Sequence, residues 1–167
     1  MTEAAGDEEV AFRMAGEADL PAIVRLLADD PLGAARERFE DPLPEEYIDA
    51  FREMNSQGGN GILIAEIGGA VAGCLQLMML PGLSRLGQKR AQIEGVRIDS
   101  RHRGRGLGAA LLRHALKIAA DNGCALAQLT TDRSRDDALR FYERHGFVNS
   151  HHGLKLALQQ APDVTDS

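Results

Sequence analysis

The chain has few cysteines and no pattern of metal ligands. Its 167 residues include two cysteines, Cys74 and Cys124, each inside an apolar, strand-like segment that is typical of a reduced core thiol. One pair of cysteines is no disulfide framework. The five histidines show none of the HExxH or CxxC spacings that hold zinc. We therefore expect a fold without disulfides and without a metal site.

We expect no secretory leader, and the chain has neither a membrane-length apolar run nor an excess of positive charge. No positive segment followed by an apolar stretch opens it, and no apolar run approaches the roughly 20 residues that cross a bilayer. Its net charge is 19 − 25 = −6, with acids concentrated near both ends. Nucleic acids and membrane surfaces usually select positively charged proteins, so neither is an expected partner. We expect a cytoplasmic protein.

The hydrophobic periodicity predicts one domain, residues 1–167, with flexible tails at 1–8 and 160–167. The expected order is strand, helix, helix, three strands, helix, strand, helix and two strands. The expected positions are 10–14, 17–30, a helix from 44, two strands around the Gly68-Gly69 turn, 91–98, 107–121, 124–131, 136–147, and a closing strand pair at 147–150 and 154–158. This order fits an α/β (α+β) fold, a mixed and mostly antiparallel sheet flanked by helices. The apolar strand at 124–131 is expected to be covered on both faces.

Three glycines interrupt a basic segment directly before a predicted helix, in the stretch RHRGRGLGAALLRHALKIAA, residues 101–120. A surface turn explains them poorly, because each costs about 0.5–1 kcal/mol relative to alanine. A dinucleotide fingerprint matches Gly104, Gly106 and Ala109, but that motif needs the strand to run straight into the first glycine, and DSRHR intervenes. A nucleoside-triphosphate loop needs Lys-Ser or Lys-Thr after its last glycine, and two alanines follow instead.

A pyrophosphate cradle explains the stretch best. Glycines let consecutive backbone N–H groups converge on an anion, and the following helix adds the positive end of its dipole. Arg101, Arg103 and Arg105 supply further charge for phosphate oxygens. The segment therefore indicates a cofactor that carries a diphosphate.

The segment RGRGLG, residues 103–108, resembles the R/Q-x-x-G-x-G/A signature of the GCN5-related N-acetyltransferase (GNAT) family. IEGVRIDSRHRGRGLGAALL is similar to that family's fourth strand and acetyl-CoA loop, and ALRFYERHGF is similar to its A-x-x-F-Y-x-x-x-G-F helix. The resemblance covers nearly the whole chain. It implies the GNAT-like acyl-CoA acyltransferase fold, with acetyl-CoA as cosubstrate and a small-molecule amine as acceptor.

The resemblance also implies which residues bind acetyl-CoA. The pantetheine arm would pair with the backbone of the fourth strand, and the pyrophosphate would rest on the amides of the signature. The implied residues are Val96, Arg97 and Ile98 for the arm, and Arg103, Gly104, Arg105, Gly106, Leu107 and Gly108 for the pyrophosphate. Many members carry asparagine where this chain has Arg135, so the chain departs from the family in the side chain offered to the arm.

Tyr142 is the candidate general acid. It occupies the position of the family's acid tyrosine, and a phenol is still protonated at neutral pH, so it has a proton for the departing thiolate. The alternative is a half-buried core aromatic beside Phe141.

Glu94 is the candidate base that takes the proton of the amine. It is a carboxylate inside an otherwise apolar strand, and a buried charge without a partner is costly unless it has a function. The alternatives are a solvent-facing glutamate, a partner of Arg97, or a chain of waters. We expect a bulge near Gly95 to re-aim Glu94, and the Val96 N–H to stabilise the oxyanion.

The acceptor is less clearly indicated. Arg85, Lys89 and Arg90, in the loop LSRLGQKR, hint at an anionic small amine, and a solvated surface loop is the alternative. We expect direct attack by a primary amine on the thioester. Two other classes are a non-catalytic acyl-CoA sensor and a nucleic-acid contact through RHRGRG, which the acidic remainder of the chain disfavours. The oligomeric state stays open, although a homodimer is common among similar proteins.

Overall fold

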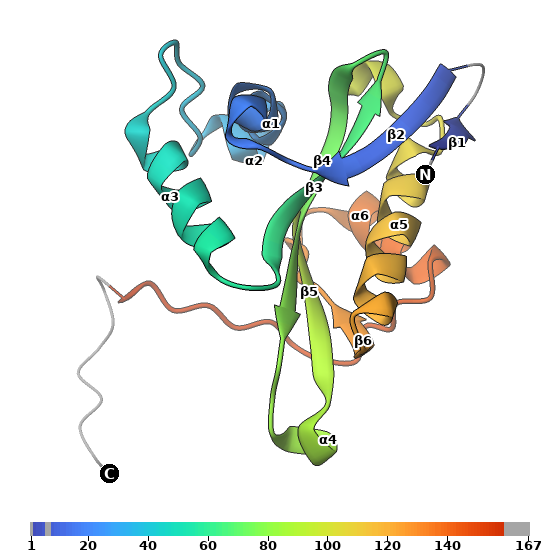
Figure 1. Ribbon diagram of the computed structural model, residues 1–167. Coiled ribbons are helices and arrows are strands. Elements are labelled where there is room, and N and C mark those ends of the chain that lie inside the picture. The colour runs from blue at the N-terminus through green and yellow to red at the C-terminus, as the bar shows by residue number, and fades with distance from the viewer. Residues whose placement is uncertain (1, 6–7, 159–167) are drawn as a thin grey trace. The chain divides into compact units, whose positions relative to one another are not determined.

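Six strands form one sheet in the first part of the chain (Figure 1). The computed structural model describes residues 2–5 and 8–158 and divides into two compact units between Leu129 and Thr130. In the first unit the strands lie in chain order, each antiparallel to the next except the last two, which are parallel. They are β1 (Thr2–Ala5), β2 (Glu8–Met14), β3 (Asn60–Ile67), β4 (Ala70–Leu80), β5 (Lys89–Ile98) and β6 (Cys124–Gln128). The predicted mixed, mostly antiparallel sheet is confirmed.

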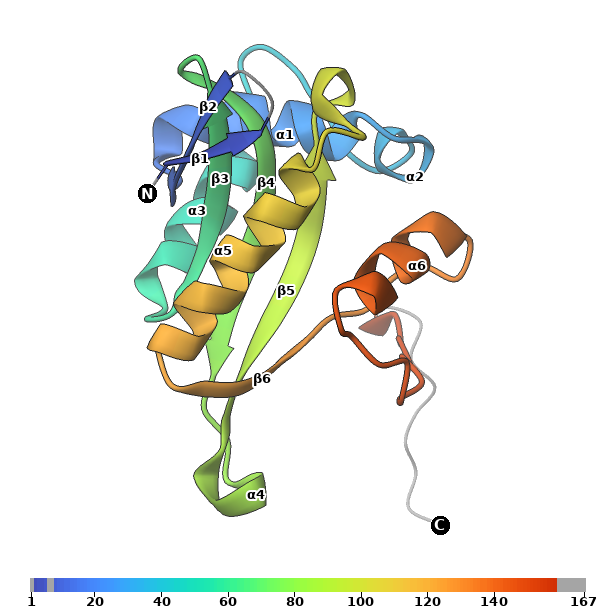
Figure 2. The same cartoon turned by 90° about the vertical axis from the view of Figure 1, so that its right-hand side faces the viewer.

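Helices cover both faces of this sheet (Figures 1 and 2). One face carries α1 (Leu20–Ala28) and α3 (Glu45–Ser56), and the other carries α5 (Leu107–Asp121). These helices confirm the expected ones. Shorter turns complete the unit: η1 (Glu17–Asp19), α2 (Pro31–Ala34), α4 (Ser84–Gly87) and η2 (Ser100–His102).

The core has a layer on each side of the sheet. Ile23 and Leu26 of α1 form a buried cluster with Ile64 and Cys74 of the sheet. On the opposite face Leu111 of α5 is fully buried. Because burial of one such aliphatic side chain contributes about 1.5–3 kcal/mol, the apolar stripes of the two helices fix them to the sheet.

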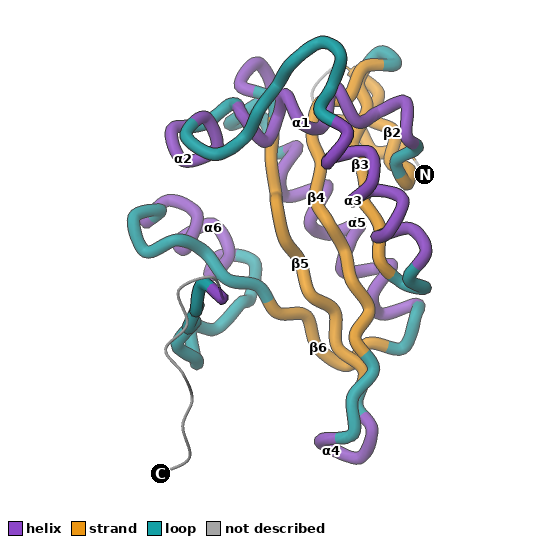
Figure 3. The backbone as a smooth tube through the Cα atoms, turned by 90° about the vertical axis from the view of Figure 1, so that its left-hand side faces the viewer, coloured by secondary structure: helices purple, strands orange, loops and turns teal. Residues whose placement is uncertain are grey.

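β5 extends beyond β6 at one end of the sheet (Figure 3). Their parallel pairing ends at Gln92 and Gln128, whereas β5 continues to Ile98. The last residues of β5 therefore have one edge outside the ladder with β6. The expectation of a strand at 124–131 covered on both faces is wrong, because β6 ends at Gln128 and both Ala125 and Gln128 are exposed.

The second unit is described by residues 130–158 and contains one helix, α6 (Asp136–Arg144). The predicted closing strand pair at 147–150 and 154–158 is wrong. These residues form no strand, and Val148 and Leu154 are 80% and 91% exposed. Strand backbone groups need hydrogen-bonding partners, and alternating apolar residues do not by themselves supply one.

A strand lies within the segment 1–8 that the sequence predicts to be a flexible tail. Thr2–Ala5 form β1 and pair with β2. The tail expected at 160–167 lies outside the described residues. Among the described helices, none has the length and apolar character needed to cross a membrane.

Candidate functional site

A buried aspartate fixes the turn between β5 and α5. Asp99 directly follows β5 and is 2% exposed. Its carboxylate accepts hydrogen bonds from the Arg101 backbone N–H at 3.0 Å and from the Arg101 guanidinium at 2.8 and 2.9 Å. The hydrogen bonds from the Arg101 side chain hold the pKa of Asp99 well below its usual value. The ionised carboxylate therefore sets the path of the chain into the glycine-rich segment.

No side chain in the described part of the protein caps the backbone N–H groups at the start of α5. Gly106 is the N-cap residue, with φ +83°, a left-handed conformation that favours glycine. The helix that follows has 15 residues, so its first N–H groups carry the positive end of a full-length dipole. A Cβ added at Gly104 or Gly106 would meet no heavy atom within 4 Å. These two glycines therefore border open space beside the positive end of the helix, which suits an anionic ligand.

The three arginines of the glycine-rich segment differ in how far their side chains are free to bind a ligand. Arg101 is engaged with Asp99, so the prediction that its side chain serves phosphate is not supported. Arg103 donates to the Ile98 carbonyl at 3.0 Å and approaches a carboxylate oxygen of Asp29 at 3.4 Å, and it is half exposed. The Arg105 side chain is exposed and bonds to none of the described residues. Arg105, and in part Arg103, can therefore contact a ligand at this helix end.

A β-bulge interrupts β5 before this turn. Gln76 of β4 pairs with Glu94, and Cys74 pairs with Arg97, so one residue of β4 faces two of β5. Gly95, one of those two, has φ +60°, which favours glycine. The expected bulge near Gly95 is confirmed, and it leaves backbone groups of β5 out of the ladder beside its free edge.

The bulge changes the face on which the side chains of β5 lie. Directly opposed residues of neighbouring strands share a face, so Glu94 lies on the face of Gln76 and Ile98 lies on that of Gly73. Side chains alternate between the two faces along a strand, and residues 73 and 76 of β4 are three positions apart, so these are opposite faces of the sheet. Strict alternation would have placed Glu94 and Ile98 together. The bulge therefore turns Glu94 to the face that carries α1 and α3.

Glu94 is solvent-exposed. The amide of Gln92 donates to its carboxylate at 3.4 Å. Arg97, its predicted alternative partner, instead pairs with Asp30, with Nε 3.0 Å from Oδ2. The Arg97 guanidinium also donates to the Val96 carbonyl at 2.9 Å. The Glu94 carboxylate is thus accessible and is not neutralised by Arg97.

The other two predicted site residues belong to the second unit. Tyr142 lies in α6, where its ring contacts Phe141 at 5.2 Å and Phe147 at 5.7 Å between centroids, both edge-on. Arg135 is the N-cap residue of α6, and no side-chain hydrogen bond caps that helix. The aromatic contacts hold the Tyr142 ring in one orientation.

A row of amide side chains beside Glu94 was not predicted from the sequence. Gln128 donates to Gln92 at 2.8 Å, and Gln76 donates to Asn60 at 2.9 Å. These four residues come from four neighbouring strands, β3 to β6. The sequence does show one amide side chain in each of several otherwise apolar strands, which is the feature that could have indicated the row. Only the strand register shows that these amides are neighbours.

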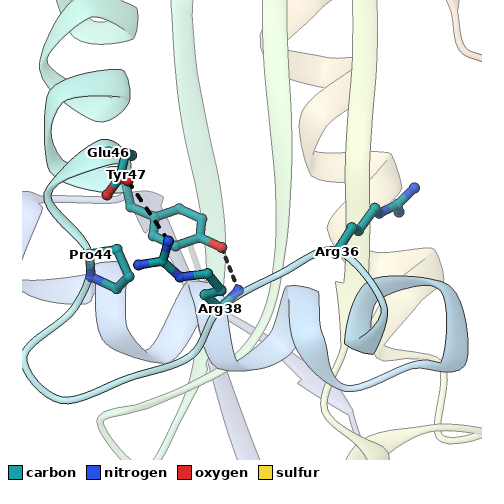
Figure 4. A pocket seen from close by; sticks show the side chains of 5 residues that line it. All are labelled: Arg36, Arg38, Pro44, Glu46 and Tyr47. Atoms are coloured by element: carbon teal, nitrogen blue, oxygen red, sulfur yellow. Dashed lines mark hydrogen bonds and ion pairs between the residues drawn. The ribbon is translucent and has the colours of Figure 1, made fainter.

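A shallow pocket lies between α2 and α3 (Figure 4). Its volume is about 120 Å³, below the roughly 300–1,000 Å³ of typical ligand pockets. The Tyr47 hydroxyl accepts a hydrogen bond from the Arg38 backbone at 2.9 Å, and Arg38 pairs with Glu40 and Glu46. Its lining residues are Arg36, Arg38, Pro44, Glu46 and Tyr47. Size and internal pairing argue against a substrate pocket here.

The basic loop before β5 lies away from the bulge. Lys89 is six residues from Gly95 along β5, about 20 Å at roughly 3.3 Å per residue. Lys89 also donates to the Asn122 carbonyl at 2.9 Å, at the end of α5. Of the three basic residues predicted to face the acceptor, Arg90 alone is placed by the strand register on the sheet face that also carries Gln92 and Glu94.

Comparison with known proteins identifies the family. A family model described as "Acetyltransferase (GNAT) family" matches residues 22–147. The chain is 31% identical over 123 residues to N-acetyltransferase 8 of Mus musculus, which covers 74% of this chain and 54% of that protein. It is 34% identical over 90 residues to glucosamine 6-phosphate N-acetyltransferase of Trypanosoma brucei brucei, which covers 54% of this chain and 59% of that protein. The chain thus spans a little over half the length of these curated relatives.

A solved structure is similar over nearly the whole chain. It is described as a transcriptional regulator from Bacillus halodurans C-125, with 48% identity and a TM-score of 0.86, covering 89% of this chain and 99% of that one. The family match extends over most of the chain and includes the glycine-rich segment, the bulged strand and α6. This chain therefore belongs to the acetyltransferase (GNAT) family.

Proposed function

We propose that the chain binds acetyl-CoA and transfers its acetyl group to the primary amine of a small molecule. The observation that carries the proposal is the start of α5, which no described side chain caps and where Gly104 and Gly106 border open space. The residues fit the donor: the amides of residues 103–108 would hold its diphosphate, with Arg105 beside them. The free edge of β5 at Val96–Ile98 would pair with its pantetheine arm. When bound, the donor supplies an activated acetyl thioester.

Glu94 takes the proton of the amine in this proposal. A lysine-like ammonium has a pKa of about 10.4 and cannot attack a carbonyl until it loses that proton. The Glu94 carboxylate is exposed beside the bulge and has no cationic partner within residues 2–5 and 8–158, so it can accept the proton directly or through one water. The backbone N–H of Val96, in the bulge, would donate to the oxyanion.

Tyr142 protonates the thiolate that departs. A phenol has a proton to donate at neutral pH, and the Tyr142 ring packs edge-on against Phe141 and Phe147. A covalent route through cysteine is disfavoured, because burial raises the pKa of the Cys74 thiol to about 12. Cys124, the other cysteine, pairs in register with Lys89, at the end of β5 away from the bulge. In this proposal the amine therefore attacks the thioester directly, with no acyl-enzyme.

Release of free thiol from acetyl-CoA tests this proposal. Mixed with acetyl-CoA and a panel of primary amines, the protein should release thiol only when an amine is present. Tight coenzyme A binding without amine-dependent release would contradict acetyl transfer.

A second candidate function is acyl-CoA binding without turnover. The 48% identical structure is described as a transcriptional regulator, and that description favours it. A sensor would bind coenzyme A through the same amides and would release no thiol. Its affinity for coenzyme A would be the same in Tyr142→Phe as in the wild type. Turnover with any amine above the uncatalysed rate would reject this alternative.

A further inference from the structure

We propose that the amide row, Asn60, Gln76, Gln92 and Gln128, is the acceptor-binding surface and that it selects a hydroxyl-rich amine such as an amino sugar. The inference rests on the proposed acetyl transfer. It adds the chemical class of the acceptor and the residues that choose it.

The amide row and Glu94 occupy one face of the sheet. Gln76 is directly opposite Glu94, and Gln92 is two residues from Glu94 on the same strand. Gln128 is paired in register with Gln92. An acceptor lying on the row therefore has its amine within reach of the proposed base.

The apolar core of this face ends where the row begins. Cys74 belongs to the buried cluster beneath α1, and Gln76, the next residue of β4 on this face, is half exposed. Gln92 is half exposed as well, and Glu94 and Gln128 are exposed. Stability alone gives little reason for the exposed amides of this row, because water satisfies exposed amides equally well.

The hydrogen bonds within the row leave much of its capacity unused. An amide side chain has two N–H donors and an oxygen with two lone pairs. The Gln92 amide accepts one hydrogen bond from Gln128 and donates one to Glu94, which leaves one donor and one lone pair. Gln76 donates once, to Asn60. Asn60 also donates to Gln57 at 3.0 Å, and Met78 lies opposite both Asn60 and Gln92. The row thus presents both donors and acceptors, with one apolar side chain among them.

This mixture matches hydroxyl groups better than other substituents. A hydroxyl both donates and accepts, so vicinal hydroxyls can replace the water on such a row without leaving a polar group unpaired. An alkyl amine displaces the same water and forms no hydrogen bonds with the amides in its place. Sites that bind substrate hydroxyls therefore discriminate strongly against analogues that lack them.

Two amines of equal ring size test the inference. Glucosamine and cyclohexylamine each carry a primary amine on a six-membered ring, and only glucosamine has hydroxyls. We expect kcat/KM, measured as thiol release from acetyl-CoA and calculated on the concentration of unprotonated amine, to be at least about 30-fold higher for glucosamine, as two or more neutral hydrogen bonds would give. The correction to unprotonated amine is needed because the hydroxyls also make the glucosamine amine less basic than that of cyclohexylamine. Equal values, or a preference for cyclohexylamine, would overturn the inference while leaving the proposed acetyl transfer intact.

Substitution of Gln92 separates binding from structure. Gln92→Leu keeps the size of the side chain and should raise KM for glucosamine about tenfold, with KM for acetyl-CoA nearly unchanged. The comparison rests on the two KM values and not on kcat, because Gln92 also donates a hydrogen bond to Glu94. Gln88→Leu, just before β5 and outside the row, is the matched control and should leave both KM values unchanged. A change in KM for acetyl-CoA as large as that for glucosamine would contradict a role in acceptor binding.

A binding measurement keeps the inference testable if no amine is turned over. Saturation-transfer NMR with coenzyme A present should detect glucosamine on the wild-type protein and a weaker signal on Gln92→Leu. If glucosamine binds but no thiol is released, the result contradicts the proposed acetyl transfer and supports the amide row as a binding surface. Absence of glucosamine binding would overturn the surface itself.

Discussion

Asp30 and Arg97 form an ion pair that joins the first turn of α2 to β5 just beyond the bulge, with Nε 3.0 Å from Oδ2. Both side chains are largely buried, at 15% and 13% exposure. Asp30 has a second role, because its other oxygen accepts the Gly33 N–H at 2.6 Å and caps α2. The pair therefore ties the segment after α1 to the strand that carries the proposed oxyanion donor.

Asp30→Asn should separate these two roles. Asparagine still caps a helix, so the substitution removes the charge and leaves Arg97 partly buried without its carboxylate. We expect the free energy of unfolding to fall by about 1–3 kcal/mol, measured by urea denaturation. Asp29→Asn is the control, because its pairing with Arg103 is exposed and such pairs contribute about 0–1 kcal/mol. Equal losses in the two variants would contradict the importance of the buried pair.

Asp99 should make stability depend on acid pH. Its folded pKa is lowered by the hydrogen bonds from Arg101, whereas an unfolded aspartate titrates near 3.9. The stabilisation is therefore fully present above about pH 5 and is lost as the pH falls below the unfolded pKa toward the folded one. We expect Asp99→Asn to cost about 2–3 kcal/mol at pH 7, a difference that shrinks below pH 4. Urea denaturation at pH 7, 4 and 3 measures it, and a difference that stays constant with pH would refute the assignment.

The sequence predicts those parts of the fold that depend on residues close together in the chain. α5 was predicted with its observed bounds, because periodicity and the glycines before it are local features. The bulge was predicted from Gly95 inside a strand, and its effect on Glu94 followed from alternation. The failed closing strands at 147–150 and 154–158 also had a local pattern, but a strand depends on a partner elsewhere in the chain.

The missing parts of the site depend on contacts distant in sequence. Arg101 looks like a phosphate ligand in its basic segment, and only the buried carboxylate of Asp99 shows that its guanidinium is engaged. Arg97 and Asp30 are far apart in sequence, so their pairing could not be inferred without the fold. The amide row requires the register of four strands at once, whereas the sequence shows isolated glutamines.

Glu94 and Tyr142 should each affect turnover without affecting donor binding. We expect Tyr142→Phe to lower kcat about ten- to a thousand-fold, and Glu94→Gln about a hundredfold or more, because each removes a proton-transfer group. KM for acetyl-CoA should stay within about threefold, as steady-state thiol release will measure. Tyr47→Phe and Glu53→Gln, outside the proposed site, are the controls. A variant whose kcat equals that of the wild type removes that residue from the mechanism.

Gly106 and Gly123 form a matched pair for testing the amides. Both have left-handed backbone, φ +83° and +79°, and a Cβ at either would meet no heavy atom within 4 Å. They lie before the first residue and after the last residue of α5. Valine at either position should cost similar stability, because the left-handed conformation is strained by about 1–2 kcal/mol for residues with a Cβ. Only valine at 106 would stand among the amides proposed to hold the diphosphate.

Calorimetric titration of coenzyme A into the wild type, Gly106→Val and Gly123→Val is the most direct measurement. The account predicts one binding site in the wild type, unchanged affinity in Gly123→Val, and affinity at least about a hundredfold weaker in Gly106→Val, as expected for lost charge-assisted hydrogen bonds. Wild-type affinity in Gly106→Val, or no association of coenzyme A with the folded wild type, would contradict it.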